Sequence, residues 1–195
     1  MSWLDSSALV TAQLLLGAVL RRGSVALRIT EVEAYAAADD PASHAWRGPT
    51  RRNAVMFGPP GRLYTYAMHG HTCANVICTP EGVGGGVLLR AGEVVLGLDE
   101  ARTRRGDVAD ARLARGPGNL TRALGITMAD AGAELFDPDS PFSLTPRDGV
   151  PEISAGPRVG VSRAADVAWR FWIAGDPTVS AYRPAKPAAR DIRPR

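Results

Sequence analysis

Cysteine and long hydrophobic runs are both scarce in this sequence. Cys73 and Cys78 are the only cysteines among 195 residues, which argues against a disulfide framework and for a reducing compartment. The longest apolar run, residues 8–20, contains two polar residues and is shorter than the roughly 20 residues that span a bilayer. Asp5 precedes it, where a secretory signal carries basic residues. We therefore expect a cytoplasmic protein with no membrane-spanning segment.

Lysine is almost absent. Lys186 is the only lysine among 23 basic side chains, which stand against 20 acidic ones. An enzyme that forms a lysine Schiff base would have this single candidate, in a Pro/Ala/Arg-rich tail. The many arginines have two explanations. Guanidinium groups bind phosphate in a bidentate way and stack on bases, whereas a GC-rich genome favours arginine codons whatever the function.

Several signatures of metal, nucleotide and acyl chemistry are missing. No C-x-x-C pair and no zinc-deaminase pattern accompany the cluster of His69, His71, Cys73 and Cys78. The glycines of residues 82–86 are not followed by Lys-Ser or Lys-Thr, so a phosphate loop is not indicated. No G-x-S-x-G supports a serine nucleophile. We expect neither a metal nor a cofactor.

What the sequence does contain is a pair of acids on a predicted strand. Val25, Leu27 and Ile29 alternate with polar or small residues, as in a strand with one face on a core. The same parity carries Glu31 and Glu33 onto the apolar face. Burying a polar group without a partner costs about 2 kcal/mol or more, and a charge costs more still. Either a partner compensates these carboxylates or a β-bulge reverses the parity.

The periodicity along the chain predicts one mixed α+β domain. Helices are expected at residues 7–22, 98–105 and 117–125, and strands at 25–34, 63–69, 72–78, 87–95, 158–161 and 169–173. Residues 36–61 and 137–157 are expected to be loops. The domain is predicted to cover residues 1–183, and residues 184–195 are predicted to form a flexible tail.

Aromatic and basic residues surround the acids in the sequence. Tyr35 closes the acidic strand, and Tyr66 lies on a predicted hairpin. The loop and the start of the hairpin add His44 and four arginines, Arg47, Arg51, Arg52 and Arg62. This composition is typical of a surface that grips phosphates and stacks bases, and equally of a solvated loop that covers a core. Arg90 lies within an apolar strand and either pairs with a buried acid or extends to solvent.

Short motifs are spread along almost the whole chain. They are EVEAY (31–35), SH (43–44), RN (52–53), MFGPPGRLYTY (56–66), CANV (73–76), VLLRA (87–91), RGPGNL (115–120), GPRVGVS (156–162), WRFWIAG (169–175) and VSAY (179–182). In this order they resemble the alkyladenine (3-methyladenine) DNA glycosylase family. The resemblance implies a curved antiparallel sheet with peripheral helices and a protruding β-hairpin that inserts into DNA.

The resemblance also implies an activity and a setting. It implies a monofunctional DNA glycosylase of base excision repair, which flips alkylated or deaminated purines out of duplex DNA and hydrolyses the N-glycosidic bond without lyase activity. The implied partner is double-stranded DNA containing a damaged purine. The protein would act as a monomer, without a cofactor, in the cytoplasm and in association with the nucleoid.

Each matching position carries an implied role. Glu33 takes the place of the general base that activates water, and Arg90 that of the arginine beside this water. Tyr35 matches the aromatic residue on one face of the flipped base, and His44 and Tyr66 match those on the other face. Glu31 has no counterpart of known role.

Other implied roles concern specificity and DNA contact. Asn75 matches the asparagine that crowds out the guanine amino group in some members. Many members insert a tyrosine into the gap left by the base; here His69, beside Met68, occupies that position. Arg47, Arg51, Arg52 and Arg62 are expected to contact the DNA backbone.

Two other classes of protein fit parts of the sequence. A non-catalytic nucleic-acid-binding protein would use the same arginine and aromatic residues. A sugar hydrolase would use a pair of acids, but the motifs do not resemble one. Release of free base from damaged duplex distinguishes these readings from a glycosylase.

Overall fold

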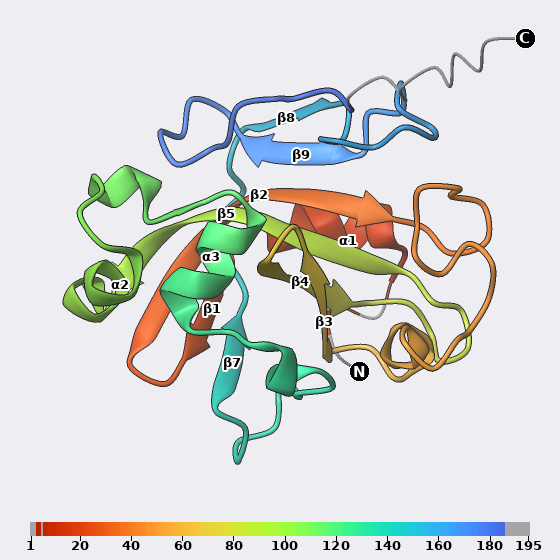
Figure 1. The fold of residues 1–195 in the computed structure, drawn as a ribbon, viewed down its shortest axis with the longest axis horizontal. Helices are drawn as coiled ribbons and strands as arrows, with labels where there is room; N and C mark the ends of the chain where they lie inside the picture. Colours follow the sequence, from red (N-terminus) through yellow and green to blue (C-terminus); the bar gives the residue numbers. More distant parts are fainter. Residues whose placement is uncertain (1–2, 5, 186–195) are drawn as a thin grey trace, which may run out of the picture.

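The computed structural model describes residues 3–4 and 6–185 (Figure 1). The elements are α1 (Ala8–Leu15), β1 (Val19–Arg22), β2 (Val25–Tyr35), η1 (Ala54–Phe57), β3 (Leu63–Met68), β4 (His71–Ile77), β5 (Gly86–Leu96), α2 (Leu98–Arg105), η2 (Asp110–Arg112), β6 (Ala114–Arg115), α3 (Pro117–Leu124), η3 (Met128–Asp130), β7 (Phe142–Thr145), β8 (Ile153–Gly156) and β9 (Arg170–Ile173). Helices and sheet form a single domain, so the predicted α+β class is confirmed.

The sheet is built around β2. Its strand order is β3-β4-β5-β2-β1-β7, and every strand pair within the described residues is antiparallel. β5 pairs along one edge of β2, while β1 and then β9 share the other edge. β8 continues the sheet beyond β9. Because the partner changes along one edge, the sheet curls, and the β8–β9 pair lies to one side of β2 (Figure 1).

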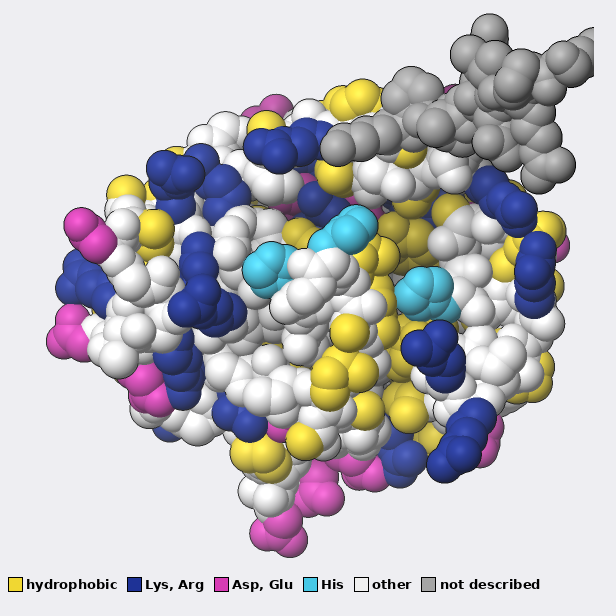
Figure 2. Space-filling view, in the orientation of Figure 1, with side chains coloured by type: hydrophobic (Ala, Val, Ile, Leu, Met, Phe, Trp, Pro, Cys, Tyr) yellow, Lys and Arg dark blue, Asp and Glu magenta, His cyan; other side chains and the backbone are white. Residues whose placement is uncertain are grey.

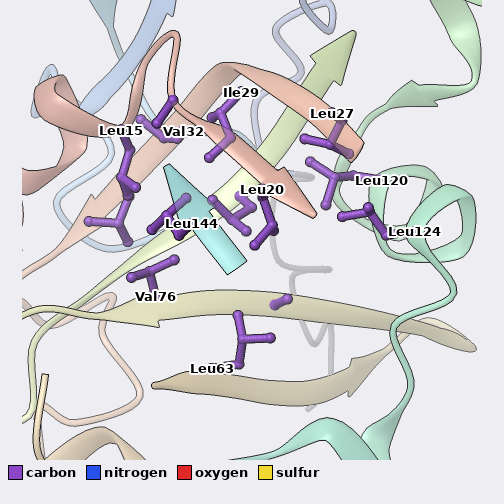
Figure 3. Packing of buried hydrophobic residues seen from close by; sticks show 14 of the residues in the cluster. Leu15, Leu20, Leu27, Ile29, Val32, Leu63, Val76, Leu120, Leu124 and Leu144 are labelled. Atoms are coloured by element: carbon purple, nitrogen blue, oxygen red, sulfur yellow. The ribbon is translucent and has the colours of Figure 1, made fainter. Parts of the chain in front are cut away.

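The main hydrophobic core lies on one face of this sheet. Strand residues such as Leu27, Ile29 and Val32 pack there with Leu15 of the N-terminal helix and Leu120 of α3 (Figure 3). All five side chains are fully buried. Truncating a buried leucine of this kind to alanine costs about 2–5 kcal/mol, so this face supplies much of the stability.

The N-terminal helix is shorter than predicted. Ser7 caps it by accepting a hydrogen bond from the Val10 N–H at 3.3 Å, and the helix ends at Leu15 instead of residue 22. Gly17 has a φ of +87°, which turns the chain out of the helix. Residues 19–22 then pair with β2 and bury Leu20 opposite Leu27. Tertiary pairing overrides the helical pattern here.

The segment from residue 137 to 161 also departs from the prediction. The sequence predicts a loop over residues 137–157 and a strand over residues 158–161. The structure instead contains β7 and β8 within the predicted loop, and residues 158–161 form no strand. Each of the two strands has only four residues. Four residues contain too few alternations of apolar and polar side chains for a strand to be recognised from the sequence. These two strands form because β7 pairs with β1 and β8 pairs with β9.

A β-bulge explains why two carboxylates continue an apolar strand. The register between β2 and β5 shifts between Ile29 and Glu31 and again between Glu31 and Val32. Val32 therefore joins the core face after Ile29, and Glu31 and Glu33 turn to the opposite face. Both acids are nevertheless fully buried, so that face must be covered and must supply partners.

Two features concern the extremities and the membrane. None of the helices in residues 3–4 and 6–185 has the length and hydrophobicity to cross a bilayer. Of the predicted tail at 184–195, residues 186–195 lie outside the described residues.

Candidate active site

A cavity of about 680 Å³ opens on the face of the sheet opposite the main core. Strand residues Glu33, Tyr66, Asn75 and Arg90 line it, and the long loop contributes His44. Residues 159–163 close another side. Figure 2 shows histidine side chains around a hollow with hydrophobic side chains inside it, and basic side chains distributed around its rim. The structure therefore gathers in one place residues that are far apart in the sequence.

Glu33 is the buried acid of this cavity. Its Oε1 accepts a hydrogen bond from the Val159 N–H at 2.6 Å, and its Oε2 accepts one from the Tyr35 hydroxyl at 2.9 Å. Arg90 Nη1 lies 3.3 Å from Oε1. An arginine and two donors thus offset the cost of burying this carboxylate. Glu33, Tyr35 and Arg90 are brought together as the sequence motifs implied.

Glu31 occupies the adjacent position on the same face. Its Oε1 accepts from Arg90 Nε at 2.8 Å, Arg170 Nε at 2.7 Å and Ser180 Oγ at 2.9 Å, and its Oε2 accepts from the Ser180 N–H at 2.7 Å. Burial alone would raise the pKa of this carboxyl, but the charges and hydrogen bonds of Arg90, Ser180 and Arg170 lower it below its ordinary value. Arg90 therefore lies between two carboxylates.

Aromatic rings form the walls of the cavity. The rings of Tyr64 and Tyr66 are stacked, with 5.8 Å between their centres. The His44 ring meets the Tyr66 ring edge-on, with 4.6 Å between the two ring centres. Burial and the neighbouring Glu33 charge raise the pKa of Tyr35, and burial with the nearby Cys73 raises that of Tyr66. Both phenols are consequently uncharged at neutral pH and remain hydrogen-bond donors.

His44 is held by its neighbours. Its Nδ1 lies 3.2 Å from the Tyr64 hydroxyl, and its carbonyl accepts a hydrogen bond from Asn53 Nδ2 at 2.8 Å. Burial lowers the pKa of the imidazole below its ordinary value of 6.5. A small cluster of Ala45, Met56 and Tyr64 anchors the loop to the hairpin strands. The long loop is therefore an ordered wall.

Asn75 lies on the cavity side of β4. It is buried, pairs in register with Tyr64 on β3 and Leu88 on β5, and donates through Nδ2 to the Tyr64 carbonyl at 3.4 Å. The amide is thus fixed against the base of the aromatic wall.

The β3–β4 hairpin ends at the mouth of the cavity. His69 and Gly70 both have positive φ, 49° and 78°, the pattern of a tight two-residue type I′ turn. Met68 is 43% exposed, and both Met68 and His69 line the cavity. A Cβ on Gly118 would lie 2.7 Å from the His71 Cβ, so only glycine lets α3 approach the hairpin this closely. Met68 and His69 are therefore exposed, while α3 packs against His71 directly after the turn.

The four predicted backbone arginines do not share one environment. Arg47, Arg51 and Arg52 are exposed, and Arg47 lies 5.4 Å from the Trp46 ring centre. Arg62 instead forms an ion pair with Glu134 beside a second, smaller hollow. The first three remain candidates for DNA contact on the loop, whereas Arg62 already has a partner.

Arg163 and Arg183 line the cavity and were not singled out from the sequence. Arg163 lies 4.9 Å from the same Trp46 ring that Arg47 contacts. Both arginines fall in the C-terminal segment, where nothing in the local pattern distinguishes them from other exposed arginines. Their position depends on how that segment folds over the sheet.

A buried ion pair that the sequence did not reveal supports the cavity from below. Arg158 donates to both oxygens of Asp40 at 2.6 and 2.9 Å and to the Ala34 carbonyl at 3.0 Å, and both charged side chains are fully buried. Its guanidinium lies 4.7 Å from the Tyr35 ring centre and 5.1 Å from that of Trp169. In the sequence, only its place in the GPRVGVS motif indicated that Arg158 is important.

The histidines and cysteines of the hairpin do not converge. Cys78 belongs to the main core, whereas Cys73 lines the cavity on the other face of the sheet. Burial raises the pKa of Cys73, and it raises that of Cys78 to about 12. In the part of the chain that the structure describes, no group of three or more His, Cys, Asp or Glu side chains is arranged to hold a metal ion.

The fold and the site define a class of protein. A fully buried carboxylate beneath a slot with aromatic walls suits an enzyme that acts on a flat ring. The sequence profile of the methylpurine-DNA glycosylases matches residues 2–177. The chain belongs to this family of DNA glycosylases, hydrolases that act on N-glycosidic bonds, so the resemblance seen in the motifs is confirmed.

Individual relatives agree with the profile. A protein from Mycolicibacterium fortuitum is 57% identical over 189 residues, which cover 92% of this chain and 97% of the relative. One from Nocardia farcinica is 55% identical over 193 residues, which cover 93% of this chain and 91% of the relative. One from Mycobacterium tuberculosis (strain ATCC 25177 / H37Ra) is 54% identical over 179 residues, 88% of each chain. All three carry the provisional name 3-methyladenine DNA glycosylase.

Proposed function

We propose that this protein is a monofunctional glycosylase that removes 3-methyladenine and related alkylated or deaminated purines from duplex DNA. The observation that carries the proposal is the environment of Glu33, a fully buried carboxylate beside Arg90 within an aromatic-walled cavity. A base inside a duplex is out of reach, so the enzyme must unstack it and bind it in such a cavity.

The walls suit a swung-out purine. Stacking on an aromatic ring returns about 1–3 kcal/mol per base with little regard to base identity. A methylated purine with a positive ring gains about 0.5–2 kcal/mol more from electron-rich faces. Tyr35 on one side and His44 with Tyr66 on the other are the proposed stacking partners. Asn75, fixed at the base of this wall, is proposed to exclude the guanine amino group.

Glu33 and Arg90, at the bottom of the cavity, suit hydrolysis of the N-glycosidic bond. As the N-glycosidic bond lengthens, the sugar becomes cation-like, and the Glu33 carboxylate can stabilise it and accept a proton from the attacking water. The Arg90 guanidinium, 3.3 Å away, can help to hold the Glu33 carboxylate in place against the attacking water. The alkylated base leaves readily because its ring already carries positive charge. Because the reaction needs no lysine, we propose that the product is an intact abasic site.

The exposed hairpin suits the gap that the base leaves. Met68 and His69 at its tip are the proposed inserting residues, since either side chain can fill an unstacked step. Arg47, Arg51 and Arg52 on the loop are proposed to bind phosphates. The paired Arg62 is a weaker candidate for this role. We further propose that the protein acts as a monomer in the cytoplasm, at the nucleoid.

Base release tests this function. Duplexes containing 3-methyladenine, 7-methylguanine, hypoxanthine or ethenoadenine are incubated with the protein, and free base is measured by chromatography against an undamaged duplex. We expect release of at least one damaged base and an uncut abasic strand. Tight, salt-sensitive binding without release from any of the four would instead identify a non-catalytic DNA-binding protein.

The pH dependence of lesion binding provides a second test. Because burial lowers the pKa of His44 below 6.5, the ring is neutral at pH 7 and becomes charged only as the pH falls through the lowered value. A charged imidazole repels a positively charged purine. We expect the preference for 7-methylguanine over neutral hypoxanthine to be constant near pH 7 and to fall as the pH is lowered below 6.5. Binding is measured in Glu33→Gln, which prevents turnover, and the fall should vanish when His44→Gln is added. The same fall in both proteins would contradict this role.

A further inference from the structure

Glu31 has contacts that a merely space-filling acid would not need. It is fully buried, and four hydrogen bonds reach its two oxygens from Arg90, Arg170 and Ser180. These partners come from β5, β9 and the segment after β9. No role for this residue follows from the sequence motifs.

Stability alone does not account for the cluster. Two arginines and two glutamates meet here, and replacing a buried ionic group of this kind by apolar side chains is often neutral or stabilising. The mutual attraction of the charges therefore gives no sufficient reason for their presence. The geometry that they impose on one another is a further reason for their presence.

That geometry concerns the orientation of Arg90. Its Nε is held by Glu31 at 2.8 Å, and its Nη2 lies 3.3 Å from Ser180 Oγ, which in turn donates to Glu31. A guanidinium is planar, so fixing two of its nitrogens fixes the third. The remaining nitrogen, Nη1, is the one that lies 3.3 Å from Glu33 Oε1. Glu31 thus determines how Arg90 meets Glu33.

Ser180 extends this control to the C-terminal segment. Its backbone N–H and hydroxyl both bind Glu31, and its carbonyl accepts a hydrogen bond from Arg170 Nη2 at 2.7 Å. Three residues later, Arg183 lines the cavity and accepts a backbone hydrogen bond from Gly160. The cluster that holds Arg90 therefore also anchors the segment that leads to Arg183, which has its own contact with Gly160.

We propose that Glu31, with Arg170 and Ser180, forms a positioning cluster that holds Arg90 against Glu33 for the glycosylase reaction. This inference rests on the proposed function. Misplacing a catalytic group by about 1 Å can cost roughly 100-fold in rate. Loss of the cluster therefore slows the chemical step and leaves binding of the damaged base largely intact.

The experiment compares Glu31→Gln and Ser180→Ala with Thr178→Ala. Thr178 joins the same C-terminal segment to the same strand through a 2.7 Å hydrogen bond with Thr30. Neither threonine lines the cavity. We expect single-turnover base release to fall roughly 10- to 100-fold in Glu31→Gln and less in Ser180→Ala, with dissociation constants for lesion DNA within about threefold of wild type. Thr178→Ala should keep the wild-type rate even if it unfolds more readily.

A double-mutant cycle distinguishes positioning from general weakening. If Glu31 acts through Arg90, adding Glu31→Gln to Arg90→Lys should slow the reaction little further. Independent effects would multiply, and that result would overturn the proposal. Wild-type rates in folded Glu31→Gln or Ser180→Ala would overturn it too. If Glu31→Gln does not fold, the cycle is run with Ser180→Ala. Failure of the proposed function is a separate result, because wild type itself would then release no base.

Discussion

Glu33→Gln should abolish base release while leaving binding to lesion DNA nearly intact. General-base catalysis contributes about 10²–10⁴-fold, and the carboxylate is also expected to stabilise the cation-like sugar. We therefore expect a loss of at least about 10³-fold in the single-turnover rate. The measurement is chromatographic release of the damaged base, paired with a direct binding assay.

The neutral side chain should be tolerated by its surroundings. A glutamine oxygen can still accept the hydrogen bond that the Val159 N–H now donates to Oε1 at 2.6 Å, and Arg90 keeps its partner Glu31. Glu93→Gln provides a matched control, because Glu93 lies on the adjacent β5 and pairs with Arg28 at the surface. It should retain wild-type activity. Substantial turnover by Glu33→Gln would show that Glu33 is not the base.

Asp40→Asn should destabilise the protein by about 3–5 kcal/mol, since it leaves the Arg158 guanidinium buried without a countercharge. Both side chains are fully buried, and the two hydrogen bonds between them measure 2.6 and 2.9 Å. A loss of this size is a large fraction of the roughly 5–15 kcal/mol that stabilises a typical domain. Denaturant unfolding of wild type and variant measures it.

Two further variants define the cause. Asp110→Asn removes an acid that pairs with Arg102 at the surface, with both side chains about half exposed, and it should change stability far less. A double variant, Asp40→Leu with Arg158→Met, removes both charges and should recover much of the loss. If Asp40→Asn unfolds like the Asp110→Asn control, then the pair does not stabilise the fold as argued.

The consequences of Asp40→Asn should reach the cavity. Arg158 packs against Tyr35 at 4.7 Å and immediately precedes Val159, which donates to Glu33. A displaced guanidinium would therefore disturb one aromatic wall and one partner of the buried acid. Base release should decline at temperatures where the variant is still folded.

The elements that were predicted correctly owe their shape to local chemistry. The helix at 98–105 and the one that begins with Pro117 match the structure, because a proline at the first helical position and a following glycine act within a few residues. The hairpin around Gly70 matches for the same reason. The first helix was overextended because residues 19–22 follow their partner on β2 instead of their own helical pattern.

The residues of the candidate site also fall into two groups, those that the sequence identified and those that only the tertiary structure revealed. Glu33, Tyr35, His44, Tyr66, Asn75 and Arg90 were named from motifs, and all six line one cavity. Glu31, Asp40 and Arg158 gain their importance only from partners more than 50 positions away in the chain. The hydrophobic periodicity of the sequence does not reveal these partners, because the environment of a buried charge depends on segments that are distant in the chain.

The sequence by itself determined the family, the α+β class and the set of groups available for chemistry, since these follow from residue identity and spacing. Tertiary structure alone decided which face the two glutamates occupy, which arginine each one meets and which arginines remain unpaired at the surface. The reason is physical. A bulge of one residue reverses the parity of a strand, and the energy of a charge depends on the partners that folding brings within about 3 Å.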